Sequence, residues 1–304
     1  MIGIVMFFAA LVLLLVGFPV AFTFGGVALL FGVFAEGPDM FAFMPYRIYS
    51  IMGNTVLMAI PLFIFMGIVL QKTKLAEQLL ESMGKLFGGV RGGLAISTIL
   101  VGALLAASTG VVGASVVAMG LISLPVMLKY NYDKRLACGT ICAAGTLGQI
   151  IPPSIILIIL GDVMGIPVGD LFKAAVAPGM ILIGVYVTYI LIKAYRNPEQ
   201  APAMPMDDDG SDKTEQYLHA IKAVLPPLIL ILVVLGSIFA GIATPTESSA
   251  LGGFGALVLA LLYRQLNWNM VYESAMETVK ITAMVFAILL GATAFSMAFT
   301  YTGG

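Results

Sequence analysis

The sequence contains the stretch Gly145-Thr146-Leu147-Gly148-Gln149-Ile150-Ile151-Pro152-Pro153-Ser154 near the middle of an uncharged apolar run, Leu136 to Gly161. Pro152 and Pro153 each lack a backbone N–H, and each disfavours helical geometry at the residue before it. A helix therefore cannot pass through this stretch unbroken. With Gly145 and Gly148 just upstream, the pattern predicts a discontinuous helix whose two halves meet between Gly145 and Ser154. The alternative is a simple proline kink that meets a packing need.

The composition of the whole chain predicts a membrane protein. Of 304 residues, 60% are hydrophobic and 10% are charged, whereas soluble domains carry about 45 to 50% apolar and about 25% charged residues. The net charge of −1 lacks the basic excess that nucleic-acid binding needs, so we expect no nucleic-acid partner. Cys138 and Cys142 have no His, Asp or Glu beside them, which argues against a metal site or disulfide framework. We expect both to be small buried residues.

The charged residues divide the chain into spans, because a crossing needs about 20 apolar residues. Residues 1–35 are interrupted at Gly17-Phe18-Pro19, and the sequence leaves open whether they form one broken span or two. Leu75 to Val90 alternates charged and apolar residues at helical spacing, which predicts an amphipathic helix in the interface. Arg196 to Lys222 is rich in Pro and Asp, which predicts a solvated linker. The other expected apolar segments are Thr55–Leu70, Val176–Ile192, Val224–Phe239, Pro245–Leu262 and Ile281–Thr300.

The uncharged run Gly92 to Leu128 has a basic cluster at each end. Because Lys and Arg concentrate in cytoplasmic loops, a single crossing would force one of these clusters outside. The middle of the run, Ala106 to Ser115, is rich in small residues, and each arm would be only about 25 Å long. These features predict a re-entrant helical hairpin over residues 92–128. The alternative is a pair of full helices that pack closely through their small residues.

The two irregular segments predict an ion site. Non-helical backbone at membrane depth is tolerated where protein buries it or where it lines a watery cavity. Unwound carbonyls can coordinate Na⁺, and half-helix N-termini favour anions. Hydroxyls of Ser108, Thr109, Thr146 and Ser154 suit a hard cation. The absence of ionisable side chains from both runs argues against a proton relay at this site.

Glu247 lies near the start of an apolar segment, where a carboxylate is a functional candidate. Thr244, three residues before it, makes a helix-capping role the preferred interpretation. An intramembrane enzyme is not expected, because the membrane runs contain no His, Lys or Asp to act as a base or as a pair of carboxylates.

Five motifs carry a resemblance to a known family: Gly17-Phe18-Pro19-Val20-Ala21, Ile60-Pro61-Leu62-Phe63-Ile64, Ala106 to Gly120, Gly145 to Ser154, and Ala243-Thr244-Pro245-Thr246-Glu247. Over essentially its whole length, the chain resembles the large membrane subunit (the DctM-like M subunit) of tripartite ATP-independent periplasmic (TRAP) transporters. The resemblance implies an all-α polytopic membrane protein of the bacterial inner membrane, with an inverted-repeat, elevator-type fold like that of the ion transporter superfamily. It implies Na⁺-coupled import of an organic acid such as a dicarboxylate, sialic acid or a similar carboxylate. A periplasmic binding protein would deliver the substrate, and a small four-span membrane subunit would complete the scaffold in the lipid bilayer.

The resemblance also implies domains and site residues. Residues 1–74 would be scaffold spans, 75–195 a transport-domain half with the broken helix at 136–161, 196–222 a cytoplasmic linker, and 223–304 the start of a second repeat. On this basis the chain is expected to be incomplete at its C-terminal end. A structural or pore-forming subunit is the alternative function. By position, the Na⁺ ligands would be Ser108, Thr109, Gly110, Gly145, Gly148, Ile151 and Pro152, and substrate would lie beside Gly113, Ser115, Thr146 and Ser154.

Overall fold

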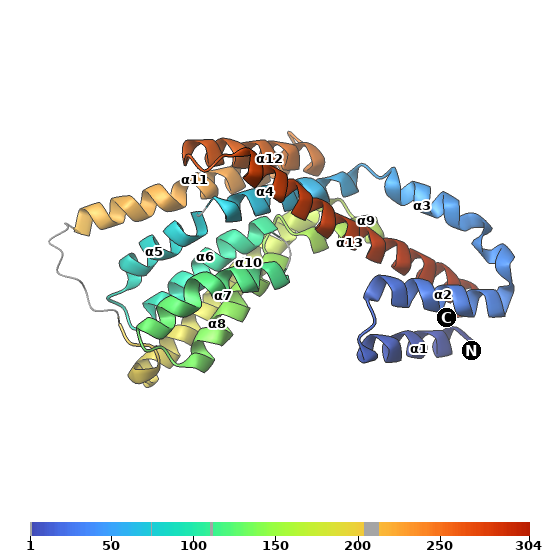
Figure 1. Ribbon diagram of the computed structural model, residues 1–304, viewed down its shortest axis with the longest axis horizontal. Helices are drawn as coiled ribbons and strands as arrows, with labels where there is room; N and C mark the ends of the chain where they lie inside the picture. Colours follow the sequence, from blue (N-terminus) through green and yellow to red (C-terminus); the bar gives the residue numbers. More distant parts are fainter. Residues whose placement is uncertain (1, 74, 110–111, 204–212) are drawn as a thin grey trace. The chain divides into compact units, whose positions relative to one another are not determined.

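The computed structural model describes residues 2–73, 75–109, 112–203 and 213–304, and every regular element within these residues is helical (Figure 1). The chain forms two compact units. One unit combines Met1–Thr55 with Val279–Gly304, and the other comprises Val56–Thr278.

The smaller unit begins with two short helices, α1 (Ile2–Val16) and α2 (Val20–Glu36). Gly17 between them has φ +103°, a conformation that residues with a Cβ rarely adopt. Met6 and Ala10 of α1 share a buried cluster with Val27 and Ala28 of α2. The two helices therefore fold back on each other (Figure 1), which favours a tight pair over one broken span. The unit is completed by η1 (Pro38–Phe43), α3 (Met44–Met52) and the later part of α13 (Trp268–Tyr301).

The larger unit holds the remaining helices and the candidate site. Its buried core joins side chains of α5, α6, α7, α8 and α10. In chain order the elements are η2 (Val56–Met58), α4 (Ala59–Lys72), α5 (Leu75–Phe87), α6 (Gly93–Thr109), α7 (Val112–Lys129), α8 (Lys134–Thr146), η3 (Leu147–Gln149), α9 (Ile155–Met164), α10 (Val168–Arg196), η4 (Pro198–Gln200), α11 (Lys213–Phe239), α12 (Pro245–Leu262) and the first part of α13.

The structure describes helical elements at both ends of the predicted linker over residues 196–222. A short helical turn follows α10 at Pro198–Gln200, and α11 already begins at Lys213. The physical reason lies in the composition, because Lys213 to Lys222 contains neither Pro nor Gly and consists mostly of residues that tolerate a helix well. The three prolines of the segment, Pro198, Pro202 and Pro205, all precede this part.

Glu247 caps α12, as the preferred interpretation predicted. The Thr244 backbone N–H and hydroxyl both donate to Glu247 Oε2, each at 2.8 Å, and the Glu247 backbone N–H donates to Thr244 Oγ1 at 3.3 Å. This reciprocal pair is a capping box, which satisfies donors that the first helical turn leaves unpaired. The carboxylate therefore has a structural partner at the start of its helix.

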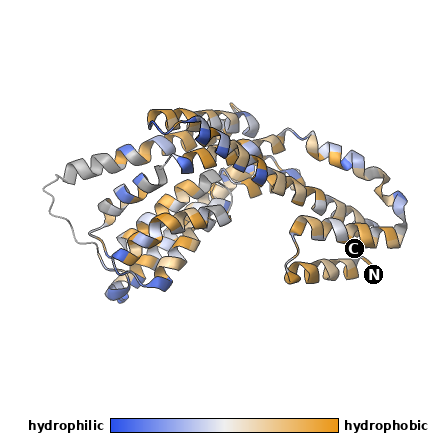
Figure 2. Ribbon diagram, viewed as in Figure 1, coloured by the Kyte–Doolittle hydropathy of each residue, from blue (hydrophilic) through white to orange (hydrophobic). Residues whose placement is uncertain are grey.

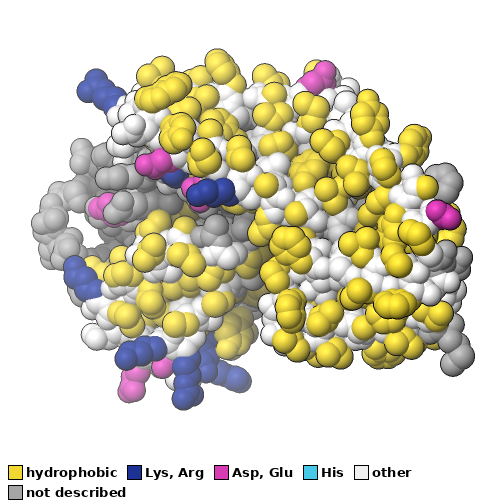
Figure 3. Space-filling model, turned by 45° about the vertical axis from the view of Figure 1, so that its right-hand side comes forward, with side chains coloured by type: hydrophobic (Ala, Val, Ile, Leu, Met, Phe, Trp, Pro, Cys, Tyr) yellow, Lys and Arg dark blue, Asp and Glu magenta, His cyan; other side chains and the backbone are white. Residues whose placement is uncertain are grey.

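The surface of the described chain is strongly apolar. Three of the described helices, α10, α12 and α13, are long and apolar enough to cross a membrane, or four spans are counted when a bent pair of shorter helices is taken as one. Hydrophobic residues predominate along the ribbon in Figure 2, and their side chains are spread widely over the face seen in Figure 3. Such extensive apolar exposure is expected of a protein that lies in lipid or contacts membrane partners.

Candidate functional site

The helix is interrupted where the two prolines predict. α8 ends at Thr146, η3 adds one tight turn, and α9 begins at Ile155 after a non-helical connection over residues 150–154. The peptide bond between Pro152 and Pro153 is cis. The sequence prediction of a discontinuous helix is thus confirmed.

Local hydrogen bonds hold the interrupted segment. The Ser154 hydroxyl donates to the Gln149 carbonyl at 2.7 Å, spanning the two prolines. The backbone N–H groups of Ile150 and Ile151 both donate to the Leu147 carbonyl at 3.0 Å. Leu147 and Ser154 are fully buried. The connection is buried at Pro152, Pro153 and Ser154 but exposed at Ile150, and irregular backbone at membrane depth is tolerated where protein buries it or where it lines a watery cavity.

The arms of the predicted hairpin, α6 and α7, both pack against α8. A β-carbon added at Gly102 of α6 would lie 2.5 Å from Ala144 Cβ, and one added at Gly145 would lie 2.9 Å from Val116 Cα on α7. α6 also packs against η3. Since Gly145 is one residue from the end of α8 and Val116 lies in the first turns of α7, the arms meet α8 beside the interruption.

The four predicted Na⁺ ligands of the second segment lie together at the interruption. Gly145, Gly148 and Pro152 are buried, and Ile151 is half-buried. Ser108 and Thr109 are the last residues of α6, and their side chains lie outside the described part of the structure, as does all of Gly110. The structure therefore brings together the broken-helix half of the predicted ligand set.

The four predicted substrate residues fall into two groups. Ser115 and Ser154 are buried, whereas Gly113 and Thr146 are exposed. The Thr146 hydroxyl donates to the Ala143 carbonyl at 2.9 Å, so its proton is turned back onto its own helix, while its oxygen can still accept or coordinate. The Ser154 hydroxyl likewise donates its proton to a backbone carbonyl, that of Gln149. Both oxygens can therefore coordinate a cation but neither donates freely to a substrate.

Sequence reasoning missed the polar contacts that fix the other ends of α6 and α8. The Leu94 backbone N–H at the start of α6 donates to the Tyr132 hydroxyl at 3.3 Å, and burial raises the pKa of Tyr132 to about 12. Asp133 caps α8 by accepting from the N–H groups of Arg135 and Leu136, each at 3.0 Å. An Asp directly before a helix is a readable N-cap signal, but the role of Tyr132 depends on a contact far along the chain.

The expectation of two buried cysteines was wrong. Cys138 and Cys142 are both exposed, because α8 turns its other face, with Leu136, Ala137, Ile141 and Ala144, into the core. Four residues apart on a helix, the two thiols share one outward face. Among the described residues, no group of three or more His, Cys, Asp and Glu side chains could hold a metal ion.

Fold, surface and the interrupted helix define the class of protein: an all-helical, multi-pass membrane protein whose candidate site is built on a broken helix. Residues 6–304 match the family described as "Tripartite ATP-independent periplasmic transporter, DctM component", and the chain belongs to this family.

Three relatives illustrate the match. The C4-dicarboxylate TRAP transporter large permease protein DctM of Pseudomonas aeruginosa is 31% identical over 266 residues, which cover 86% of this chain and 60% of that protein. The ectoine/5-hydroxyectoine TRAP transporter large permease protein UehC of Ruegeria pomeroyi is 32% identical over 301 residues, covering 97% and 68%. The isethionate TRAP transporter permease protein DctMQ of Oleidesulfovibrio alaskensis is 29% identical over 283 residues, covering 93% and 44%. The chain thus spans well under the full length of these relatives, which are transporter permeases and not enzymes.

Proposed function

We propose that the chain is the large permease subunit of a Na⁺-coupled secondary transporter that imports an organic acid across the bacterial inner membrane. Family membership supports the permease assignment. One observation carries the site: the buried interruption between α8 and α9, packed against both arms of the predicted hairpin through Gly102, Ala144, Gly145 and Val116. In this proposal α6 and α7 form the re-entrant hairpin, whose tip faces the interruption.

Na⁺ binding follows from the kinds of atom that the site offers. The region has backbone carbonyls released from helical pairing by Pro152 and Pro153, and hydroxyl oxygens at Thr146 and Ser154. Hard cations prefer such oxygens, and no carboxylate is needed for a monovalent ion. Ser108, Thr109 and Gly110 at the hairpin tip would supply the remaining ligands.

An organic acid is the substrate class that the site and the relatives support together. α9 begins at Ile155 without a side-chain cap, so the positive end of its dipole favours a carboxylate nearby. Relatives carry the names of C4-dicarboxylate and isethionate. In this proposal substrate lies next to the Na⁺ site, beside Gly113, Ser115, Thr146 and Ser154.

The proposed mechanism is an elevator. Residues 75–195 would move as a transport domain past the spans of residues 1–74 and of the segment that follows residue 222. A small four-span membrane subunit would extend the static scaffold, and a periplasmic binding protein would deliver the substrate. The tight packing of α6, α7 and α8 supports their movement as one body, because closely packed helices resist relative displacement.

Reconstitution tests the proposal. The full-length permease, its small subunit and its binding protein would be placed in proteoliposomes, and uptake of labelled C4-dicarboxylate, isethionate and ectoine would be measured with and without an inward Na⁺ gradient. We expect uptake of one acid only with the gradient. Equal uptake without Na⁺ would exclude coupling, and leakage of all three solutes at similar rates would favour a pore.

A further inference from the structure

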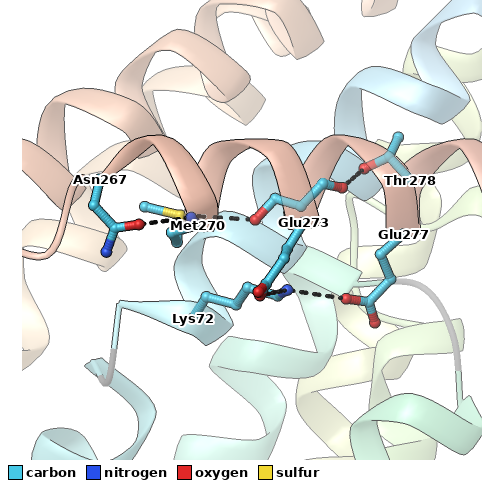
Figure 4. A network of polar contacts seen from close by, with 7 residues as sticks. Lys72, Asn267, Met270, Glu273, Glu277 and Thr278 are labelled. Carbon is cyan, nitrogen blue, oxygen red and sulfur yellow. Dashed lines mark hydrogen bonds and ion pairs between the residues drawn. The ribbon is translucent and has the colours of Figure 1, made fainter.

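A second polar feature lies away from the broken helix, where α4 ends and α13 begins. Lys72 at the end of α4 lies 3.1 Å from Glu273 Oε2 and 3.5 Å from Glu277 Oε2, both on α13 (Figure 4). An open pocket of about 610 Å³ adjoins this group, and its lining includes Lys72, Gln265, Asn267, Trp268, Asn269 and Glu273. None of these residues belongs to the proposed Na⁺ or substrate site.

The charged side chains at the pocket could pair with both charges of a zwitterionic ligand, and negative charge is in excess. One ammonium faces two carboxylates, so the group carries a net charge of −1. The side chain of Lys72 is 27% exposed, whereas that of Glu273 is 65% exposed. The carboxylate is therefore the charged group that a ligand meets first. Hydrogen-bonding amides of Gln265, Asn267 and Asn269 stand beside it.

The residues around the pocket match the headgroup level of a membrane. Trp268 is 80% exposed, and Trp and Tyr are enriched at the boundary between lipid and water. Leu261 and Leu262, at the end of α12 just before the pocket, are also exposed. On its other side in sequence the pocket is followed by the uncharged run Ile281 to Thr300, which is long enough to enter hydrocarbon. Polar pocket residues and the exposed apolar side chains of Leu261 and Leu262 thus lie close together in the chain.

We propose that this pocket binds the headgroup of an amine-bearing zwitterionic phospholipid of the phosphatidylethanolamine type. The primary ammonium has three N–H donors for Glu273, which lines the pocket, while Glu277 adds negative charge beside it through its contact with Lys72. The exposed indole of Trp268 offers an aromatic face to the same cation. The amide side chains donate to the phosphodiester oxygens. An anionic lipid is disfavoured by the excess carboxylate, and a choline headgroup has no N–H to donate.

The experiment compares lipids and variants in the full-length permease purified with its small subunit. The protein would be placed in nanodiscs of phosphatidylcholine that contain a minor fraction of phosphatidylethanolamine or phosphatidylglycerol, and co-purifying lipid would be counted by native mass spectrometry. We expect the wild-type protein to retain phosphatidylethanolamine in preference to both others. Glu273→Gln/Glu277→Gln should lower that retention about tenfold, the loss expected for a charge-assisted hydrogen bond.

Two further variants separate lipid binding from a purely structural ion pair. Trp268→Ala leaves the ion pair intact and should still lower phosphatidylethanolamine retention. Glu199→Gln, an exposed carboxylate outside the pocket, should change nothing. The proposal is overturned if the double variant keeps the wild-type preference, or if phosphatidylcholine or phosphatidylglycerol is retained equally well. It is also overturned if phosphatidylethanolamine binds the permease only when the small subunit is absent, because the pocket is then a protein interface.

Discussion

Gly145 on α8 and Val116 on α7 approach so closely that a β-carbon added at Gly145 would lie 2.9 Å from the Val116 Cα. Backbone atoms cannot give way as the end of a flexible side chain can. This contact fixes the end of α8 against the first turns of α7, and so fixes the interruption of the broken helix against the predicted hairpin.

Gly145→Ala should therefore destabilise the full-length permease, by about 1 to 3 kcal/mol, as overpacking of a tight interior typically does. Gly139→Ala on the same helix is the matched control, since nothing lies within 4 Å of its added β-carbon. That variant should be neutral or slightly stabilising, because Ala favours a helix more than Gly. Thermal unfolding in detergent measures both. Equal effects of the two substitutions would contradict the close packing of α8 on α7.

Ser154→Ala should lower stability by about 1 kcal/mol, because the buried hydroxyl bridges the interruption to the Gln149 carbonyl. Thr146→Val is the control at the other end of the same segment, where the hydroxyl is exposed and bonds only one turn back on its own helix. We expect it to leave the unfolding midpoint nearly unchanged. A Ser154→Ala variant as stable as the wild-type protein would mean that this bond does not hold the interruption.

Tyr132→Phe should change how stability depends on alkaline pH. Burial raises the pKa of Tyr132 from 10.0 to about 12, so the folded chain holds the phenol proton more tightly than the unfolded chain does. The stability that this proton confers is fully present below pH 10 and is lost as the pH rises towards 12. The free energy of unfolding, measured by denaturation across this pH range, should therefore fall less steeply with pH in the variant.

The same substitution should cost about 1 kcal/mol at neutral pH, because the Leu94 N–H loses its acceptor. Tyr46→Phe, at an exposed tyrosine on α3, should keep the wild-type profile. If Tyr132→Phe retained the full alkaline loss of stability, the titrating group would lie elsewhere.

Glu247→Gln tests the assignment of this carboxylate as a helix cap. The amide can still accept from Thr244, so we expect a small decrease in the unfolding midpoint and no change in the Na⁺ dependence of uptake. Uptake measured over a range of Na⁺ concentrations decides the matter. A raised Na⁺ requirement in this variant would place Glu247 in the ion pathway instead.

What the sequence predicted correctly rests on local chemistry. Pro152 and Pro153, with Gly145 and Gly148 just upstream, mark the interruption, although a proline pair does not interrupt every helix, since Pro226 and Pro227 lie inside α11. Thr244 with Glu247 forms a capping box within a single turn. The start of α11 was missed because the predicted linker included Lys213 to Lys222, whose residues are compatible with a helix. Only the part before Lys213 is rich in Pro and Asp.

Other features depend on partners far apart in the chain. Cys138 and Cys142 are exposed because the opposite face of α8 packs against α6 and α7. The apolar sequence of α8 has no periodicity that would indicate which face is buried. Lys72 and Glu273 pair across 201 positions of sequence. The turn at Gly17 separates two helices in a run that is long for one span and short for two, so its length did not decide between a broken helix and a tight pair.

The most direct test of the proposed function is the Na⁺ concentration that half-saturates uptake in proteoliposomes, compared between the wild-type permease and Ser108→Ala/Pro152→Ala. The pair removes a hydroxyl at the hairpin tip and a proline that interrupts the helix. We predict at least about a tenfold higher Na⁺ requirement, as expected for loss of an interaction with a charged group, while Gly139→Ala keeps the wild-type value. An unchanged Na⁺ requirement in the paired variant would contradict a Na⁺ site between the hairpin tip and the broken helix.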